Sequence, residues 1–215
     1  VGGSLRQLRS TFRELAMHYP QTKLFLVAYL FFNDGIQTVI GNSSLYGIEE
    51  LGFPQTTVLA VFLFVQFTAF IGARLFGVVA GRVGAWRTVL SGIGVWTLIV
   101  VVAYFVPAQR LVLFLALAFA IGLVLGGTQA LSRSLYSQLI PAGKEAEYFS
   151  LYQAMERGTS WFGTLIFGLV YQSTLSYRAA ILALIVFFVL GGLLLSRVRM
   201  REGIVAAGNE VPAVI

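Results

Sequence analysis

The chain has 215 residues, of which 58% are hydrophobic and only 11% are charged, and its mean hydropathy is +0.84. A water-soluble domain carries roughly a quarter charged residues, so this composition indicates an integral membrane protein and excludes an ordinary soluble fold. Cysteine is absent, which excludes disulfides and thiolate metal sites, and the net charge of +6 comes from small basic groups between apolar runs, where membrane lipid rather than nucleic acid is the expected partner.

The first 20 residues lack the apolar core of a signal peptide. Hydrophobic side chains instead recur at helical spacing beside arginines, at Leu5, Leu8, Phe12 and Leu15 and at Arg6, Arg9 and Arg13. This pattern predicts an amphipathic cytoplasmic helix over 1–20 that lies on the membrane surface. A linker helix packed on neighbouring loops would show the same pattern.

Residues 21–200 predict a bundle of six transmembrane helices. A bilayer core of about 30 Å needs about 20 apolar helical residues per crossing. Such stretches occur at about 22–43, 55–80, 88–106, 111–132, 147–171 and 178–196. All five prolines fall between or beyond them, where a missing backbone donor costs nothing. Residues 201–215 are small and weakly polar and predict a flexible cytoplasmic tail.

Lysine and arginine gather in alternate connections. They precede the first stretch, join the second to the third and the fourth to the fifth, and follow the sixth, whereas the opposite loops hold only Arg110 and Arg178. Positively charged loops stay on the cytoplasmic side, so both termini are expected to face the cytoplasm.

Charged and strongly polar side chains inside the apolar stretches gather in four of the six, whereas the segments SGIGVWTLIVVVAYF of the third and AAILALIVFFVLGGLLLS of the sixth carry no charge. These polar side chains are Asn33, Asp34 and Gln37 in the first, Gln66 and Arg74 in the second, Thr128, Gln129, Ser132 and Arg133 in the fourth, and Glu156 and Arg157 in the fifth. Because intramembrane polar groups face protein or water, these four helices are expected to surround a path, with the third and sixth facing lipid. The order of two polar helices followed by one apolar helix occurs twice along the chain. This order predicts an inverted three-plus-three repeat.

Asp34 lies about ten residues into its stretch, or about 15 Å, which places it near the bilayer midplane and makes proton binding physically possible. Asn33, Asp34 and Gly35 also form a turn-forming sequence, so a helix broken at Gly35 would expose backbone groups for an ion or a substrate. The alternative is a structural carboxylate that is hydrogen-bonded across the bundle.

Glu156 and Arg157 are adjacent, so they point about 100° apart on a helix and each is expected to pair with another element. Arg157 is a candidate for binding a substrate carboxylate, and Glu156 with Arg133 is a candidate for a cytoplasmic gate. A static ion pair between the fourth and fifth stretches is the alternative. Gln37, Gln66 and Gln129 could form hydrogen bonds to a polar solute. Such residues also join helices inside a bundle without contacting a ligand.

The sequence GVVAGRVGAWR after the second stretch resembles the signature loop of the major facilitator superfamily. Gly77, Arg82, Gly84 and Arg87 match the pattern, whereas Gly81 stands where that family usually has aspartate. Four longer segments, YLFFNDGIQTVI, GLVLGGTQALSRSLYSQLIP, EAEYFSLYQAMERGTSWFGTLIFGLV and YRAAILALIVFFVLG, resemble in order and spacing the C-terminal half of the bacterial branch related to the autophagy-linked vacuolar amino-acid effluxers.

The resemblance implies an all-α membrane fold in which two six-helix bundles enclose a central cavity, of which this chain supplies one. Its expected partner is a second six-helix half, either a missing N-terminal bundle or an identical subunit. The implied function is that of a secondary active transporter, or half of one, in a bacterial inner membrane. It would move a small polar, amino acid-like solute by alternating access, with proton coupling through Asp34 as a hypothesis.

Other functions lack their signatures. An intramembrane protease needs a base beside its serine, and the only histidine, His18, precedes the first stretch. No zinc pair, phosphate-cradling loop or channel filter sequence occurs, so neither an enzyme, a channel nor a cofactor is expected. The remaining alternative is a half-length membrane protein with a structural or regulatory role and no transport of its own.

Overall fold

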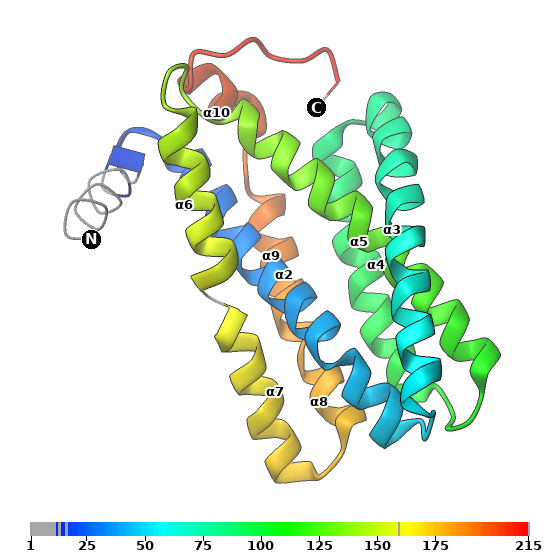
Figure 1. Ribbon diagram of the computed structural model, residues 1–215. Helices are drawn as coiled ribbons and strands as arrows, with labels where there is room; N and C mark the ends of the chain where they lie inside the picture. The colour runs from blue at the N-terminus through cyan, green and yellow to red at the C-terminus, as the bar shows by residue number, and fades with distance from the viewer. Residues whose placement is uncertain (1–11, 13, 16, 159, 215) are drawn as a thin grey trace.

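The computed structural model describes residues 12, 14–15, 17–158 and 160–214, and all regular secondary structure in this part of the chain is helical (Figure 1). The elements are α2 (Pro20–Leu45) with the π-helical turn η1 (Tyr46–Glu50), α3 (Gln55–Val83), α4 (Ala85–Phe105), α5 (Leu111–Gln138), α6 (Glu145–Gly158), α7 (Ser160–Thr174), α8 (Tyr177–Ala183), α9 (Ile185–Ser196) and α10 (Met200–Ala206).

Within the described residues, five helical segments are long and apolar enough to cross a membrane, at Pro20–Glu50, Gln55–Val83, Ala85–Phe105, Leu111–Gln138 and Tyr177–Ser196. They correspond to the predicted first, second, third, fourth and sixth crossings. The predicted fifth crossing corresponds to α6, which has 14 residues and carries several charges, and to α7, which has 15 and is apolar. These two helices run end to end along one side of the bundle (Figure 1), and because Thr159 between them lies outside the described residues, one continuous helix over 147–171 stays a prediction.

The helices pack in an order that relates the two triplets. The first helix of each triplet packs on the last helix of the other: α2 packs on α9, and α5 packs on α4. The second helix of each triplet packs on the first helix of the other: α3 packs on α5, and α6 and α7 pack on α2. Helices α2 and α5 run in opposite directions between the two ends of the bundle, as an inverted repeat requires (Figure 1). Helices α4 and α9 lie behind α2, α3 and α5 in this view. The predicted all-α bundle, one half of a major facilitator fold, is confirmed.

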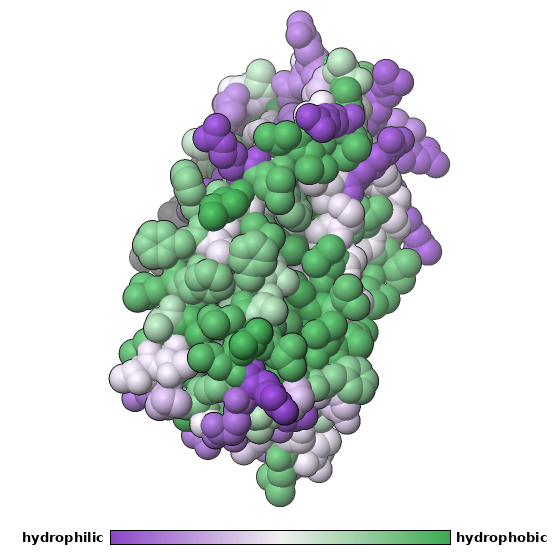
Figure 2. All heavy atoms as spheres, turned by 90° about the vertical axis from the view of Figure 1, so that its right-hand side faces the viewer, coloured by the Kyte–Doolittle hydropathy of each residue, from purple (hydrophilic) through white to green (hydrophobic). Residues whose placement is uncertain are grey.

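The surface carries a broad hydrophobic band between two hydrophilic ends (Figure 2). Large apolar side chains exposed on α3, α4 and α9 include Phe67, Phe70, Leu98 and Leu193. Exposed apolar area on this scale is stable in hydrocarbon and not in water. The chain is therefore an integral, multi-pass membrane protein.

Glycines allow the closest helix pair, α3 with α5. A Cβ atom on Gly126 would lie 1.8 Å from the Ala69 carbonyl oxygen, and one on Gly72 would lie 2.1 Å from the Leu123 carbonyl oxygen. No larger residue fits at these distances. Small residues are what lets membrane helices approach closely and gain packing energy.

Helix α2 continues through Gly35, so the predicted break at this residue is wrong. In hydrocarbon each unpaired backbone group is costly, which favours an unbroken helix over the local turn tendency of the sequence. Gly35 instead lets α9 approach, since a Cβ there would lie 3.0 Å from Phe187 Cβ and 3.1 Å from Phe188 Cζ.

Part of the predicted tail packs against the bundle, at α10 and Asn209. Helix α10 buries Ile204, and Asn209 Nδ2 donates to the carbonyl oxygens of Gln138 at 2.9 Å and Ile140 at 2.8 Å. These are carbonyls at the end of α5 that no helical turn can satisfy. Most of the amphipathic helix predicted over 1–20 lies outside the described residues.

Candidate functional site

The polar side chains gather where α2, α5 and α6 meet, which we call the α2–α5–α6 junction. Residues three or four apart share one face of a helix. The junction is accordingly lined by Tyr29 and Asn33 of α2, Gln129, Ser132 and Arg133 of α5, and Tyr152 and Glu156 of α6.

Asn33 and Gln129 form an amide pair that joins the first helices of the two triplets. Gln129 Nε2 donates to Asn33 Oδ1 at 2.8 Å, and the Asn33 side chain is buried. Gln37 lies one turn further along α2 and is half-buried. A hydrogen bond between amides is a stable way to place polar groups at this depth, and both groups can exchange it for a polar solute.

Arg133 and Glu156 form a charged pair one turn beyond the amide pair on α5. Arg133 Nη2 lies 3.8 Å from Glu156 Oε2, and the two side chains are 61% and 22% exposed. A charge-assisted hydrogen bond spans about 2.7–2.9 Å, so this pair is loosely held. The Arg133 guanidinium also lies 6.0 Å from the centre of the Tyr152 ring, within the range of a cation–π contact.

Stacked tyrosines close the junction. The Tyr152 ring lies 4.3 Å from that of Tyr29 and 5.0 Å from that of Tyr136, whose hydroxyl donates to the Tyr148 carbonyl oxygen at 2.9 Å. The hydroxyls of Tyr29 and Tyr152 are buried next to each other and interact, although their geometry falls short of a full hydrogen bond. Ser132 Oγ is buried without a hydrogen-bond partner among the described residues, which costs about 1–3 kcal/mol.

Asp34 lies beside Asn33 in the sequence but faces α7 instead of the junction. Its side chain is fully buried, and Oδ2 accepts a hydrogen bond of 2.8 Å from the Gly163 N–H in the first turn of α7. A hydrogen bond from a backbone N–H to a carboxylate is charge-assisted and stronger than one between neutral groups. Asp34 Oδ1 and Thr38 Oγ1 have no partner in the described part of the chain. Asp34 thus ties α2 to α7.

The other predicted site residues are not brought into the junction. Gln66 is exposed on α3, and Arg157 is exposed on α6, where it lines a shallow surface depression with Gln153. The predicted path residues therefore fall into three groups: the junction, the Asp34 contact with α7, and isolated polar side chains on open helix faces.

The signature loop forms the turn between α3 and α4. Gly84 has a φ of +100°, a left-handed conformation that favours glycine, and its N–H donates to the Ala80 carbonyl oxygen at 2.9 Å. Arg82 and Arg87 are exposed around this turn, and a Cβ on Gly77 would meet no atom within 4 Å. Backbone conformation therefore explains Gly84, and packing within this half does not explain Gly77.

Sequence reasoning missed the tyrosines. Tyr152 precedes Glu156 by four residues and Tyr29 precedes Asn33 by four, so each lies one turn from a polar group on the same helix face. That spacing is the signal by which the stacked rings could have been placed at the junction.

Comparison with known proteins gives the family. The model described as "Vacuole effluxer Atg22 like" matches residues 1–208. The chain is 31% identical over 196 residues to "Uncharacterized MFS-type transporter YxiO" of Bacillus subtilis, covering 91% of this chain and 45% of that protein. It is 30% identical over 197 residues to "Autophagy-related protein 22" of Yarrowia lipolytica, covering 86% of this chain and 32% of that protein.

The chain thus spans less than half the length of these relatives. A family match that extends over almost all of its residues, with relatives in bacteria and fungi, agrees with the apolar helical bundle. The chain belongs to the Atg22-like vacuole effluxer family and represents a half related to the major facilitator transporters.

Proposed function

We propose that this chain forms one half of a secondary active transporter that moves a small polar, amino acid-like solute by alternating access. The family supports membrane transport. The observation that carries the proposal is that an amide pair and a loosely held charged pair lie together at the α2–α5–α6 junction. Polar groups inside a membrane are expensive and usually mark a path for solutes or ions.

A second six-helix half completes the path in this proposal, supplied either by further sequence of a longer polypeptide or by an identical subunit. It covers the face formed by α2, α3, α5, α6 and α7. Gln66, Arg133 and Arg157 are exposed on this half, and contact with acyl chains would be costly for all three. A facing bundle with a hydrated interface removes that cost.

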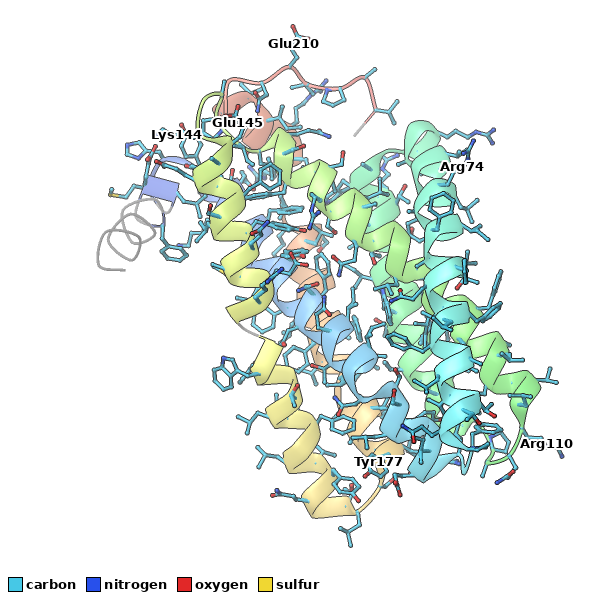
Figure 3. All side chains as sticks on the ribbon, in the orientation of Figure 1. Arg74, Arg110, Lys144, Glu145, Tyr177 and Glu210 are labelled. Carbon is cyan, nitrogen blue, oxygen red and sulfur yellow. The ribbon has the colours of Figure 1, made fainter. Side chains whose placement is uncertain are left out.

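The charged pair acts as the cytoplasmic gate of this path. Arg74, Lys144, Glu145 and Glu210 lie toward one end of the bundle, and Arg110 and Tyr177 lie at the other (Figure 3). The end with the basic connections is assigned to the cytoplasm by the positive-inside rule, with both termini on that side of a bacterial inner membrane. Arg133 and Glu156 both belong to this half, so the pair opens when α6 shifts against α5 as the two halves rock apart at this end.

Asp34 couples protons to this movement. Its carboxylate holds the first turn of α7 through the Gly163 N–H. Protonation removes the charge that strengthens this hydrogen bond, which weakens the hold and allows α7 to shift against α2. The signature-loop residues Gly77, Arg82, Gly84 and Arg87 form the cytoplasmic turn about which α3 and α4 move together.

The test is amino-acid flux in proteoliposomes containing the intact transporter, driven by a pH gradient. Asparagine at position 34 keeps the size of the side chain and can still accept from Gly163, so Asp34→Asn should fold normally and lose the dependence of flux on the gradient. Arg74→Gln, on the exposed face of α3, is the matched control. Full activity with unchanged pH dependence in Asp34→Asn would exclude Asp34 as the coupling site.

A further inference from the structure

A surface hollow of about 330 Å³ lies between the α3–α4 turn and the C-terminal segment, at the end of the bundle assigned to the cytoplasm. Two arginines and four apolar residues line it: Arg87, Arg201, Val83, Pro212, Ala213 and Val214. Arg87 belongs to the first turn of α4 and Arg201 to α10, so only the fold brings the two cationic side chains together. We call this feature the Arg87–Arg201 hollow.

Acidic side chains of this chain do not neutralise the two arginines. Within the described residues, no ion pair involves Arg87 or Arg201. Glu202, next to Arg201, is held by Arg199 at 3.1 Å, and Glu210 points away from the bundle (Figure 3). The planar fork of a guanidinium group matches the oxygens of a phosphate and binds them through paired hydrogen bonds. The hollow therefore offers a site for a phosphate anion.

Trp86 indicates the depth of the hollow in the membrane. Its indole N–H donates to the Leu195 carbonyl oxygen at 3.0 Å, which ties the start of α4 to the end of α9. Tryptophan rings favour the membrane–water interface, where the headgroups of lipids lie. Arg87 follows Trp86 directly in the sequence, so the hollow lies at the level of the lipid phosphates.

An exposed row of apolar side chains on α3 leads to the hollow. Its members recur every four residues along one side of the helix and are 37% to 74% exposed: Phe67, Ile71, Leu75, Val79 and Val83. The row spans about 24 Å, which exceeds the half-thickness of about 15 Å of the hydrocarbon core. Figure 2 looks onto the side of the bundle on which α3 lies in Figure 1, and the hydrophobic band there ends at hydrophilic side chains.

We propose that the Arg87–Arg201 hollow binds the phosphate of an anionic phospholipid from the cytoplasmic leaflet, with an acyl chain along the apolar row of α3. Basic pockets on the cytoplasmic side of membrane proteins bind headgroups of this kind. A soluble phosphate would contact the arginines but not the apolar row, so a lipid is the ligand that fits both features. The bound lipid fastens residues 212–214 to the α3–α4 turn. This site lies apart from the α2–α5–α6 junction and does not depend on the proposed transport path.

The test measures lipid binding to the purified intact transporter, stripped of lipid in detergent, by native mass spectrometry. Phosphatidylglycerol is compared with phosphatidylcholine, whose choline group neutralises the phosphate. Each basic residue near an anionic headgroup contributes about a fivefold factor in affinity. Arg87→Gln and Arg201→Gln should therefore each weaken the binding of phosphatidylglycerol about fivefold and the binding of phosphatidylcholine much less.

Arg197→Gln is the matched control. Arg197 is exposed at the end of α9 and does not line the hollow, so this variant removes the same charge and should bind phosphatidylglycerol as wild type does. Because all three arginines are exposed, each variant without lipid should melt at the temperature of the wild-type protein. Added phosphatidylglycerol should then raise the melting temperature of wild type and Arg197→Gln more than that of Arg87→Gln or Arg201→Gln.

Inorganic phosphate and glycerol phosphate distinguish a lipid from a soluble anion. Neither should displace phosphatidylglycerol from the wild-type protein, because neither can contact the apolar row. If either compound displaces the lipid and does so only when Arg87 and Arg201 are present, the hollow binds a soluble phosphate and the lipid proposal is wrong. Equal loss of phosphatidylglycerol binding in Arg197→Gln and Arg87→Gln would show general attraction to a basic surface and would also overturn the proposal.

Discussion

The contact between α7 and α2 gives a sharp test of the packing that positions Asp34. A Cβ atom added at Gly163 would lie 2.2 Å from Thr38 Oγ1 and 3.2 Å from the Asp34 carbonyl oxygen. Side chains do not tolerate the shorter distance, so Gly163→Ala must push α7 away from α2. The same displacement lengthens the 2.8 Å hydrogen bond from the Gly163 N–H to Asp34 Oδ2.

The expected loss of stability follows from three effects. Overpacking a tight interface costs about 1–3 kcal/mol. Loss of a hydrogen bond to a charged group costs about 1.5–3 kcal/mol. Alanine is more favourable than glycine inside a helix by about 1 kcal/mol. Gly163→Ala should therefore lower the free energy of unfolding by about 1.5–5 kcal/mol.

The assay is reversible unfolding in mixed detergent micelles, with Gly168→Ala as the matched control. Gly168 lies on the same helix and a Cβ there meets no atom within 4 Å, so alanine at this position should stabilise the protein by about 1 kcal/mol. In a Thr38→Ala background the 2.2 Å contact is removed and only contacts of 3.2 Å remain, so Gly163→Ala should cost clearly less than in wild type. Equal effects of the two glycine substitutions, or additive effects of Gly163→Ala and Thr38→Ala, would refute this reasoning.

Three other predictions concern the rest of the bundle. Gly126→Ala should lower the melting temperature because its Cβ would lie 1.8 Å from a backbone carbonyl of α3, whereas Gly77→Ala, which faces open space, should not; similar melting temperatures would contradict the packing. Asn209→Ala removes two hydrogen bonds to carbonyls at the end of α5 and should cost about 1–3 kcal/mol in unfolding free energy, and an unchanged value would show that α10 is not held there. Backbone hydrogen bonds lower the pKa of Glu145 below its ordinary value of 4.5, so its contribution is present above pH 4.5 and is lost as pH falls through the lowered pKa. Glu145→Gln should therefore melt below wild type at neutral pH, and this difference should disappear in strongly acidic buffer.

The crossings could be predicted because each requires a long apolar run, and that requirement is visible in one dimension. The fifth crossing is less plain in the sequence, because 147–171 combines a charged first part with an apolar second part. At Gly35 the local tendency to form a turn predicted a helix break that α2 does not have. Hydrogen bonding within α2 and packing against Phe187 and Phe188 outweigh this tendency.

The candidate site was only partly visible in the sequence. The approach of Glu156 to Arg133 could be anticipated because neighbouring residues on a helix point in different directions and an isolated charge needs a partner. The hydrogen bond from Gly163 to Asp34 could not, since it joins residues 129 positions apart through the backbone of a glycine. Tyrosines in membrane proteins commonly mark the lipid interface, which obscured the buried stack of Tyr29 on Tyr152.

The central claim is that the face of α2, α5 and α6 lines an aqueous path while the outer face of α4 contacts lipid. The chain contains no cysteine, so single cysteines can be introduced and labelled with a membrane-impermeant thiol reagent that requires water to form the reactive thiolate. In the assembled transporter, Gln129→Cys should react and be protected by bound amino acid, and Leu98→Cys, exposed on α4, should not react. Reaction at Leu98→Cys together with no reaction at Gln129→Cys would contradict the account.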